Sequence, residues 1–153
     1  DPDPINTKQA KEDKMRFSKL IAAAFLLCAA IPAAQAQTGT VQIELNKLEP
    51  QTNACRAYLV LQNGTESTFS SLRLDLVAFD SDGIVAKRLA VEASPLPPGK
   101  TSLKLFDMAD LSCEGIGNLL LNSILACGDQ NGERADCLDM IEVSSKPGLT
   151  LIK

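Results

Sequence analysis

Residues 94–107, SPLPPGKTSLKLFD, include the Gly-Lys-Thr triplet with which a phosphate-binding loop ends. The full pattern G-x-x-x-x-G-K-[ST] also needs a glycine five residues before Gly99, where this chain has Ser94. Such a loop binds phosphate through backbone N–H groups, which the three prolines of this stretch lack. The residues that follow, TSLKLF, alternate like a strand and do not begin the helix that a phosphate site requires. We therefore predict a turn that leads into a strand, and no nucleotide cofactor.

Residues 79–83, FDSDG, resemble the beginning of a calcium-binding loop. The next ligand and the closing glutamate of such a loop would stand where this chain has Ile84 and Val91. We predict a hairpin turn in which aspartate side chains accept hydrogen bonds from backbone N–H groups. A weak calcium site formed by Asp80, Asp82 and a distant carboxylate is the alternative.

Catalysis by a histidine-activated nucleophile is excluded, because the chain contains no histidine. Paired carboxylates could act as general acid and base, and the candidate pairs are Asp107 with Asp110 and Asp136 with Asp139. Acids on the loops of an acidic chain are usually solvated charges, so we predict no catalytic residue. The chain has one tyrosine and no tryptophan, which weakens the case for a surface that stacks sugars or bases.

Cysteine spacing distinguishes a disulfide framework from a metal or redox site. Outside the leader the cysteines are Cys55, Cys113, Cys127 and Cys137, with 57, 13 and 9 intervening residues. Zinc and redox sites usually contain C-x-x-C pairs, so we predict no metal site. An even number of cysteines in an exported chain indicates two disulfides. Three pairings are possible and sequence alone does not separate them; we expect Cys127–Cys137, across an Asn-Gly turn, and Cys55–Cys113.

Residues 15–36 have the three parts of a secretory signal peptide. Two basic residues come first, residues 20–34 are apolar throughout, and an Ala-Gln-Ala sequence ends at Ala36. We predict cleavage between Ala36 and Gln37, and a periplasmic or secreted location. Fifteen apolar residues fall short of the ~20 that a membrane-spanning helix needs, so we expect no stable membrane insertion after cleavage. The polar residues 1–14 are predicted to be an untranslated or disordered leader.

The remaining residues, 37–153, are predicted to form a single domain. They carry 10 basic and 15 acidic side chains, which gives a net charge of −5. This balance argues against nucleic acid and anionic membrane surfaces as partners.

From residue 41 onward, apolar side chains recur at every second position, which is typical of strands with one face in a core. The expected strands lie at residues 41–45, 55–62, 72–79, 84–92, 101–106, 122–127, 138–144 and 149–152. The apolar stretch 118–127 is also compatible with a short helix followed by a strand. Asn63-Gly64-Thr65 matches the N-glycosylation pattern, but we interpret it as a turn because the leader is of bacterial type. No long amphipathic helix is available to cover a sheet, so we predict an all-β, immunoglobulin-like β-sandwich of seven to eight strands with two disulfides.

Residues 76–88, LVAFDSDGIVAKR, followed by PLPPGKTSLKLFD, resemble the FxLYD group of immunoglobulin-like modules. Leu76, Ala78, Phe79 and Asp80 match the motif in kind, and YLVLQNGTES resembles the strand that precedes it. The chain from residue 37, with its four cysteines, is also similar to a family of uncharacterised exported alphaproteobacterial proteins, often labelled by a twin-arginine signal. This chain has no adjacent arginines in its leader. The resemblance implies an immunoglobulin-like sandwich outside the cytoplasm and supplies no catalytic residue or ligand.

These patterns lead us to expect an exported, non-catalytic β-sandwich that binds an envelope protein of unknown identity, or supports an envelope structure. The alternatives are a small carboxylate-dependent hydrolase or lyase, and a carrier that holds a small apolar ligand between the sheets.

Overall fold

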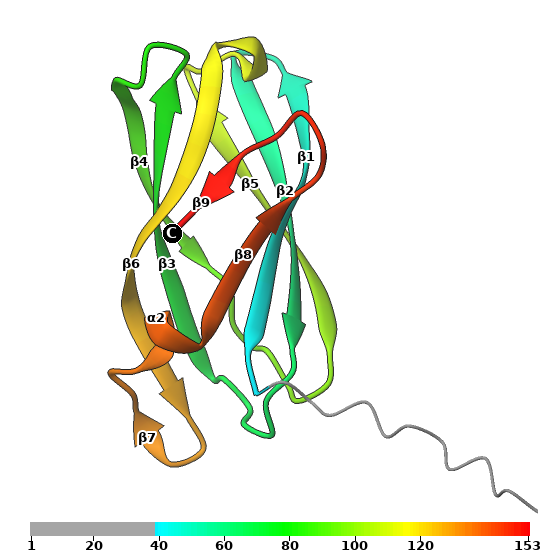
Figure 1. The fold of residues 1–153 in the computed structure, drawn as a ribbon, viewed down its shortest axis with the longest axis vertical. Coiled ribbons are helices and arrows are strands. Elements are labelled where there is room, and N and C mark those ends of the chain that lie inside the picture. The colour runs from blue at the N-terminus through cyan, green and yellow to red at the C-terminus, as the bar shows by residue number, and fades with distance from the viewer. Residues whose placement is uncertain (1–38) are drawn as a thin grey trace, which may run out of the picture. The chain divides into compact units, whose positions relative to one another are not determined.

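The alternating segments form two β-sheets that pack face to face, in a computed structural model that describes residues 39–153 (Figure 1). The strands are β1 (Val41–Gln51), β2 (Ala54–Asn63), β3 (Ser71–Asp80), β4 (Val85–Glu92), β5 (Thr101–Ala109), β6 (Ile116–Asp129), β7 (Gly132–Glu133), β8 (Ile141–Ser145) and β9 (Leu151–Ile152). A 3-10 helix, η1 (Cys113–Gly115), and a short helix, α2 (Cys137–Met140), complete the fold. The predicted fold class, an immunoglobulin-like β-sandwich with two disulfides, is confirmed. The predicted cleavage site at Ala36 and Gln37 lies outside the described residues.

The first sheet has the strand order β5-β2-β1-β8, and the second has the order β4-β3-β6-β7, with β9 also paired to β6. Most neighbours are antiparallel, but β8 runs parallel to β1 and β9 runs parallel to β6. The chain therefore changes sheet near its end. After β7 it crosses through α2 to the first sheet as β8, and then returns to the second sheet as β9.

The core lies between the two sheets and is filled by the alternating apolar side chains. Residues Leu45 of β1 and Leu59 of β2 face Leu74 of β3 and Leu121 of β6, and all four are at most 2% exposed. Each fully buried leucine contributes about 2 kcal/mol through the hydrophobic effect. This shared burial holds the two sheets together and fixes which face of each strand is available at the surface.

The apolar stretch 118–127 belongs to one 14-residue strand, β6, so the helical alternative is wrong and the expected strand 122–127 was too short. Antiparallel pairing with β3 runs along β6 but is interrupted by three register shifts, which leave Gly117, Asn122 and Leu125 without an opposite residue. These β-bulges place the inward side chains after Leu121 at intervals of three, and that spacing imitates a helix. Gly117 is required at its bulge because a Cβ atom there would lie 2.4 Å from the carbonyl oxygen of Asp80.

The end of the chain also differs from the expected strands. The segment expected as strand 138–144 begins with helix α2, and β8 starts only at Ile141. Cys137 is buried at the first turn of α2 because of its disulfide to Cys127, and the N–H of Asp139 donates to the carbonyl of Asp136, which closes a helical turn. Strand β7 was not expected, and β9 occupies only the last part of the expected strand 149–152.

Candidate functional site

The candidate site lies at the end of β6, where the chain reverses into β7. Gly132 has a φ of +118°, a backbone conformation that favours glycine and suits the Asn-Gly turn. The side chain of Asp129 accepts a hydrogen bond from the N–H of Asn131 at 2.7 Å, which stabilises the same turn. The hairpin carries Arg134 back toward β6, and the N–H of Arg134 donates to the carbonyl of Cys127 at 3.0 Å.

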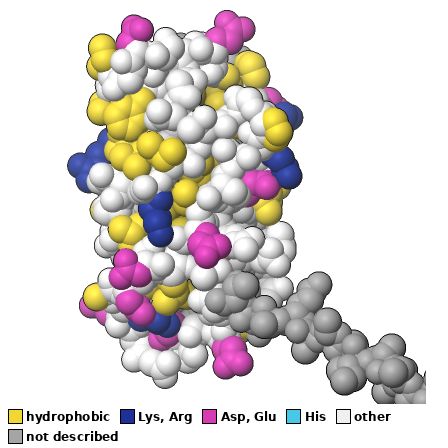
Figure 2. Space-filling model, in the orientation of Figure 1, with side chains coloured by type: hydrophobic (Ala, Val, Ile, Leu, Met, Phe, Trp, Pro, Cys, Tyr) yellow, Lys and Arg dark blue, Asp and Glu magenta, His cyan; other side chains and the backbone are white. Residues whose placement is uncertain are grey.

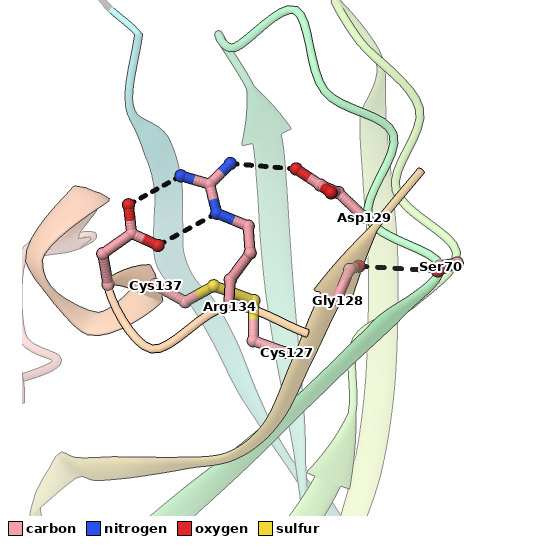
Figure 3. The surroundings of a disulfide bond; sticks show 7 residues. Ser70, Cys127, Gly128, Asp129, Arg134 and Cys137 are labelled. Carbon is pink, nitrogen blue, oxygen red and sulfur yellow. Dashed lines mark hydrogen bonds and ion pairs between the residues drawn. A yellow bond between two sulfur atoms is a disulfide. The ribbon is translucent and has the colours of Figure 1, made fainter. Parts of the chain in front are cut away.

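The guanidinium of Arg134 lies between two carboxylates (Figure 3). Its Nη1 donates to Oδ2 of Asp129 at 3.0 Å, and its Nε and Nη2 donate to the two oxygens of Asp136 at 2.9 and 2.6 Å. The N–H of Asn131 and the guanidinium of Arg134 hold the pKa of Asp129 below its usual value, and Arg134 lowers the pKa of Asp136. Both carboxylates are therefore ionised at neutral pH, and both form ion pairs with Arg134.

The disulfide between Cys127 and Cys137 fastens α2 to the end of β6 beside this arginine (Figure 3). A groove of about 640 Å³ lies next to it, lined by the second half of β6, the β7 hairpin, the start of α2, and Ser70 and Ser71. The N–H of Ser70 donates to the carbonyl of Gly128, which attaches the loop before β3 to the floor of the groove.

The second predicted disulfide, Cys55–Cys113, is also formed, so both expected pairings are confirmed. It joins β2 to η1 near the opposite end of β6, beside a smaller groove of about 360 Å³. Asn53 and Asp110 line that groove with left-handed φ angles of 56° and 63°, and the Asn53 side chain donates to Asp110 at 2.8 Å.

A polar network that the sequence did not reveal lies on the outer face of the second sheet. Asp75 of β3 is only 1% exposed, and its carboxylate accepts four hydrogen bonds. Arg88 of β4 donates two, at 2.7 and 2.8 Å, and Asn122 and Ser123 of β6 donate one each, at 2.7 and 2.9 Å. The bulge at Asn122 lets two consecutive β6 side chains reach the same carboxylate. Arg88, followed by Asn122, holds the pKa of Asp75 well below its usual range.

The residues that resembled a phosphate-binding loop form the predicted turn. The N–H of Gly99 donates to the carbonyl of Asn63 at 2.8 Å, and the N–H of Asn63 donates to the carbonyl of Lys100 at 3.0 Å. Thr101 begins strand β5, as the alternation indicated. The Asn63 side chain is fully buried and donates to the carbonyls of Ser67 and Leu96, so it acts as a turn residue.

The aspartates of the FDSDG stretch form the predicted hairpin turn between β3 and β4. Oδ1 of Asp80 accepts hydrogen bonds from the N–H groups of Asp82 and Ile84, each at 2.9 Å. Within residues 39–153, no group of three or more acidic or cysteine side chains is arranged to hold a metal ion.

Each candidate carboxylate pair contains at least one aspartate that is bound by another side chain. Asp107 forms a two-pronged ion pair with Arg56 at 2.7 and 2.9 Å, and Arg56 lowers the pKa of Asp107. Its proposed companion Asp110 accepts from Asn53 instead, and Asp136 pairs with Arg134.

The sequence matches no known protein-family model and no curated protein. Among solved structures, the chain is similar to IrmA from Escherichia coli, with a TM-score of 0.53 and 14% sequence identity. The similarity covers 68% of this chain and 90% of that chain. At this identity, the likeness supports the fold alone. In the part of the chain that the structure describes, no helix is long and apolar enough to cross a membrane.

Proposed function

We propose that the protein is an exported, non-catalytic β-sandwich that binds another protein of the cell envelope. Export is supported by the signal-peptide pattern of residues 15–36 and by two disulfides, which form and persist mainly outside the cytoplasm. The resemblance to FxLYD modules supports the same location.

The observation that carries the binding function is exposed apolar surface on the strands and at the turn before β4. Six large hydrophobic side chains are between 44% and 63% exposed: Ile84, Val85, Leu103, Leu105, Leu125 and Ile152. Single exposed hydrophobic residues are ordinary, whereas contiguous ones mark interaction surfaces.

These residues have apolar neighbours in both sheets. On the outer face of the first sheet, Leu103 lies opposite Val60, and Leu105 lies opposite Tyr58. On the second sheet, Ile152 of β9 pairs with Leu120 of β6, and Figure 2 shows hydrophobic side chains gathered on the upper half of the visible face, where β6 begins.

The state of the carboxylates favours a binding role over the hydrolase alternative. A general acid at neutral pH needs a raised pKa, so that its proton is retained until transfer. Asp107 and Asp136 have lowered pKa values, because each is paired with an arginine. Both are therefore poor proton donors.

Site-specific photo-crosslinking in the producing cells tests this proposal. A photoreactive residue would replace Leu105, Leu125 or Ile152, and matched controls would carry it at the exposed polar positions Ser81 and Glu142. We expect a discrete higher-mass adduct in the extracytoplasmic fraction from at least one apolar position and from neither control. Absence of an adduct at all three apolar positions would contradict the proposed function.

A further inference from the structure

One edge of β6 has a gap in its strand pairing. Near its start, the N–H of Leu119 donates to Thr150 beside β9, and near its end, the carbonyl of Cys127 accepts from Arg134 beside β7. Between these points no strand within residues 39–153 pairs with this side of Leu121–Ala126, which we call the β6 edge. Figure 1 shows β9 beside the upper half of β6 and β7 at its lower end.

The gap arises from the path of the C-terminal segment. In immunoglobulin-type sandwiches, the last strand lies beside the preceding long strand of the same sheet. Here the corresponding segment crosses to the first sheet and pairs with β1 as β8, and only the two residues of β9 return to β6. The position of a final strand beside β6 is therefore only partly filled.

The groove of about 640 Å³ coincides with this gap. Its lining includes four consecutive residues of the β6 edge, Ser123, Ile124, Leu125 and Ala126, together with Leu138 of α2. A strand of six residues spans about 20 Å and lies ~4.8 Å from its neighbour. The edge is thus long enough to accept one short extended segment.

The two other long sheet edges carry a lysine within the edge strand itself. Beside the β6 edge, Lys153 follows β9, and its Nζ atom donates to the carbonyls of Leu138 and Ile141 at 3.1 and 2.6 Å. Lys104 of β5 lies opposite the buried Leu59, and Lys87 of β4 lies opposite the buried Ala78, so both lysines start on the core-facing side of their edge strands. Inward-pointing charges on edge strands prevent pairing with other chains. Residues 121–126, LNSILA, contain no charged residue and no proline.

We propose that the β6 edge binds an extended peptide segment of another protein, which adds to the second sheet as a further strand. This inference rests on the proposed function and names its site and the chemistry of its partner. Backbone N–H and C=O groups of the edge supply the hydrogen bonds, as in other cases of β-strand addition. Leu125, which is 48% exposed, supplies apolar contact for one side chain of the peptide.

The groove is bordered by charges of both signs. Asp129 and Glu133 line the groove beside β7, and Arg134, which also lines it, forms ion pairs with Asp129 and Asp136. Two further cations lie close to the groove lining: Nζ of Lys153 donates to the carbonyl of Leu138, and Arg73 of β3 is paired with Ala126. The preferred segment is therefore defined by apolar side chains at alternate positions and not by a charge.

The probe is a phage library of random peptides of about twelve residues, long enough to cover the edge as a strand. It is selected against the oxidised protein purified from the producing cells. Two variants distinguish the sites: Leu125→Lys on the β6 edge and Leu105→Lys on β5, which start from 48% and 47% exposure. We expect selected peptides to bind at least about tenfold more weakly to Leu125→Lys, which corresponds to ~1.4 kcal/mol, and equally well to Leu105→Lys.

A second measurement reports the mode of binding and does not depend on either variant. N-methylation of successive backbone amides of a selected peptide should weaken binding at every second position, because alternate N–H groups of a strand face its neighbour. Amide hydrogens of residues 121–126 should become protected on binding. The inference is overturned by selection that yields no peptide, by equal binding to Leu125→Lys, by uniform tolerance of N-methylation, or by a second copy of this chain filling the edge in a stable dimer.

The two proposals fail in different ways. Adducts at Leu105 in cells, together with peptide binding that is unchanged by Leu125→Lys, would support the binding function but exclude the β6 edge as its site. Peptide binding that depends on Leu125, without an adduct at any apolar position in cells, would support strand addition at the β6 edge. It would contradict the proposed binding of an envelope protein.

Discussion

At the scale of single residues, the buried carboxylate of Asp75 links the strands of the second sheet. Burial of a carboxylate is costly, and here four hydrogen bonds from β4 and β6 offset that cost. The same bonds link three neighbouring strands, β4, β3 and β6, through one side chain. Loss of the charge would leave the donors of Asn122 and Ser123 with a poorer partner.

We predict that Asp75→Asn lowers the free energy of unfolding by about 2 kcal/mol at neutral pH, because a buried donor set loses its charged acceptor. The control is Asp107→Asn, which removes a similar ion pair at the surface, where side chains are 35% and 44% exposed. That variant should cost less than about 1 kcal/mol. Urea denaturation of both variants measures the difference, and equal losses would show that the Asp75 network is not special.

The contribution of Asp75 should also depend on pH. Its pKa is lower in the folded protein than in the unfolded chain, so its stabilising effect is complete above the unfolded pKa of about 3.9. The effect is lost as the pH falls further toward the folded pKa. The stability difference between the wild type and Asp75→Asn should therefore be constant from pH 7 to about pH 5 and shrink below about pH 4. A difference that grows on acidification would contradict this assignment.

The role of individual residues could be predicted from sequence where a known motif lacked a residue that its chemistry requires. Ser94 and the prolines were enough to reject a phosphate loop, and Ile84 was enough to favour a turn at Asp80. The burial of Asp75 could not be predicted, because alternation placed it on the outward face with other polar residues. Only the bulge at Asn122, a property of the paired strands, brings its partners together.

At the scale of elements, β6 shows how far alternation can be followed along a strand. Spacing by two predicts β2, β3 and the first half of β1, where inward side chains lie at every second position. The expected strand 41–45 was too short, because a bulge after Leu45 ends the alternation within β1. Along β6 the bulges change this spacing, so the sequence favoured a shorter strand and left a helix possible. The short strands β7 and β9 were difficult to predict for another reason, since each has only two residues.

The lysine on edge strand β5 gives a prediction about association between copies of the protein. The Nζ atom of Lys104 donates to the carbonyl of Ser94 at 3.1 Å, so the lysine crosses the open side of the sandwich. We predict that Lys104→Val leaves the fold intact but makes the protein associate through β5, because the inward charge that opposes pairing is gone. Light scattering coupled to size exclusion should show an average mass that rises with concentration.

The control for this prediction is Lys100→Val, which removes an exposed lysine in the turn just before β5. It changes the net charge by the same amount, and the average mass of the variant should equal that of the wild type at each concentration. Association of both variants to the same extent would point to lost charge in general, and not to an unprotected edge.

At the scale of the whole molecule, the disulfides limit the conformational freedom of the unfolded chain. Cys55–Cys113 closes a separation of 58 residues, and Cys127–Cys137 closes one of 10. Loop-closure entropy then predicts a stabilisation of about 4 kcal/mol for the first and about 3 kcal/mol for the second. The even cysteine count predicted two disulfides and left three pairings open, and the expected pairing is the one that forms.

We therefore expect the double variant Cys55→Ala/Cys113→Ala to lose more stability than Cys127→Ala/Cys137→Ala. Urea denaturation, with the slope of the transition compared between variants, measures both losses. Each variant also leaves the other disulfide in place, which serves as the internal control. The reverse order of stability would mean that the local structure around α2 contributes more than the entropy of the unfolded chain.

The central claim is that this chain acts outside the cytoplasm as a sandwich locked by two disulfides. The direct measurement is the intact mass of the protein recovered from the extracytoplasmic fraction, after treatment with a thiol-alkylating reagent before and after reduction. We predict a chain that begins at Gln37, takes up no reagent while oxidised, and takes up four equivalents once both disulfides are reduced. A chain that retains residues 15–36, or that is alkylated without reduction, would contradict the account.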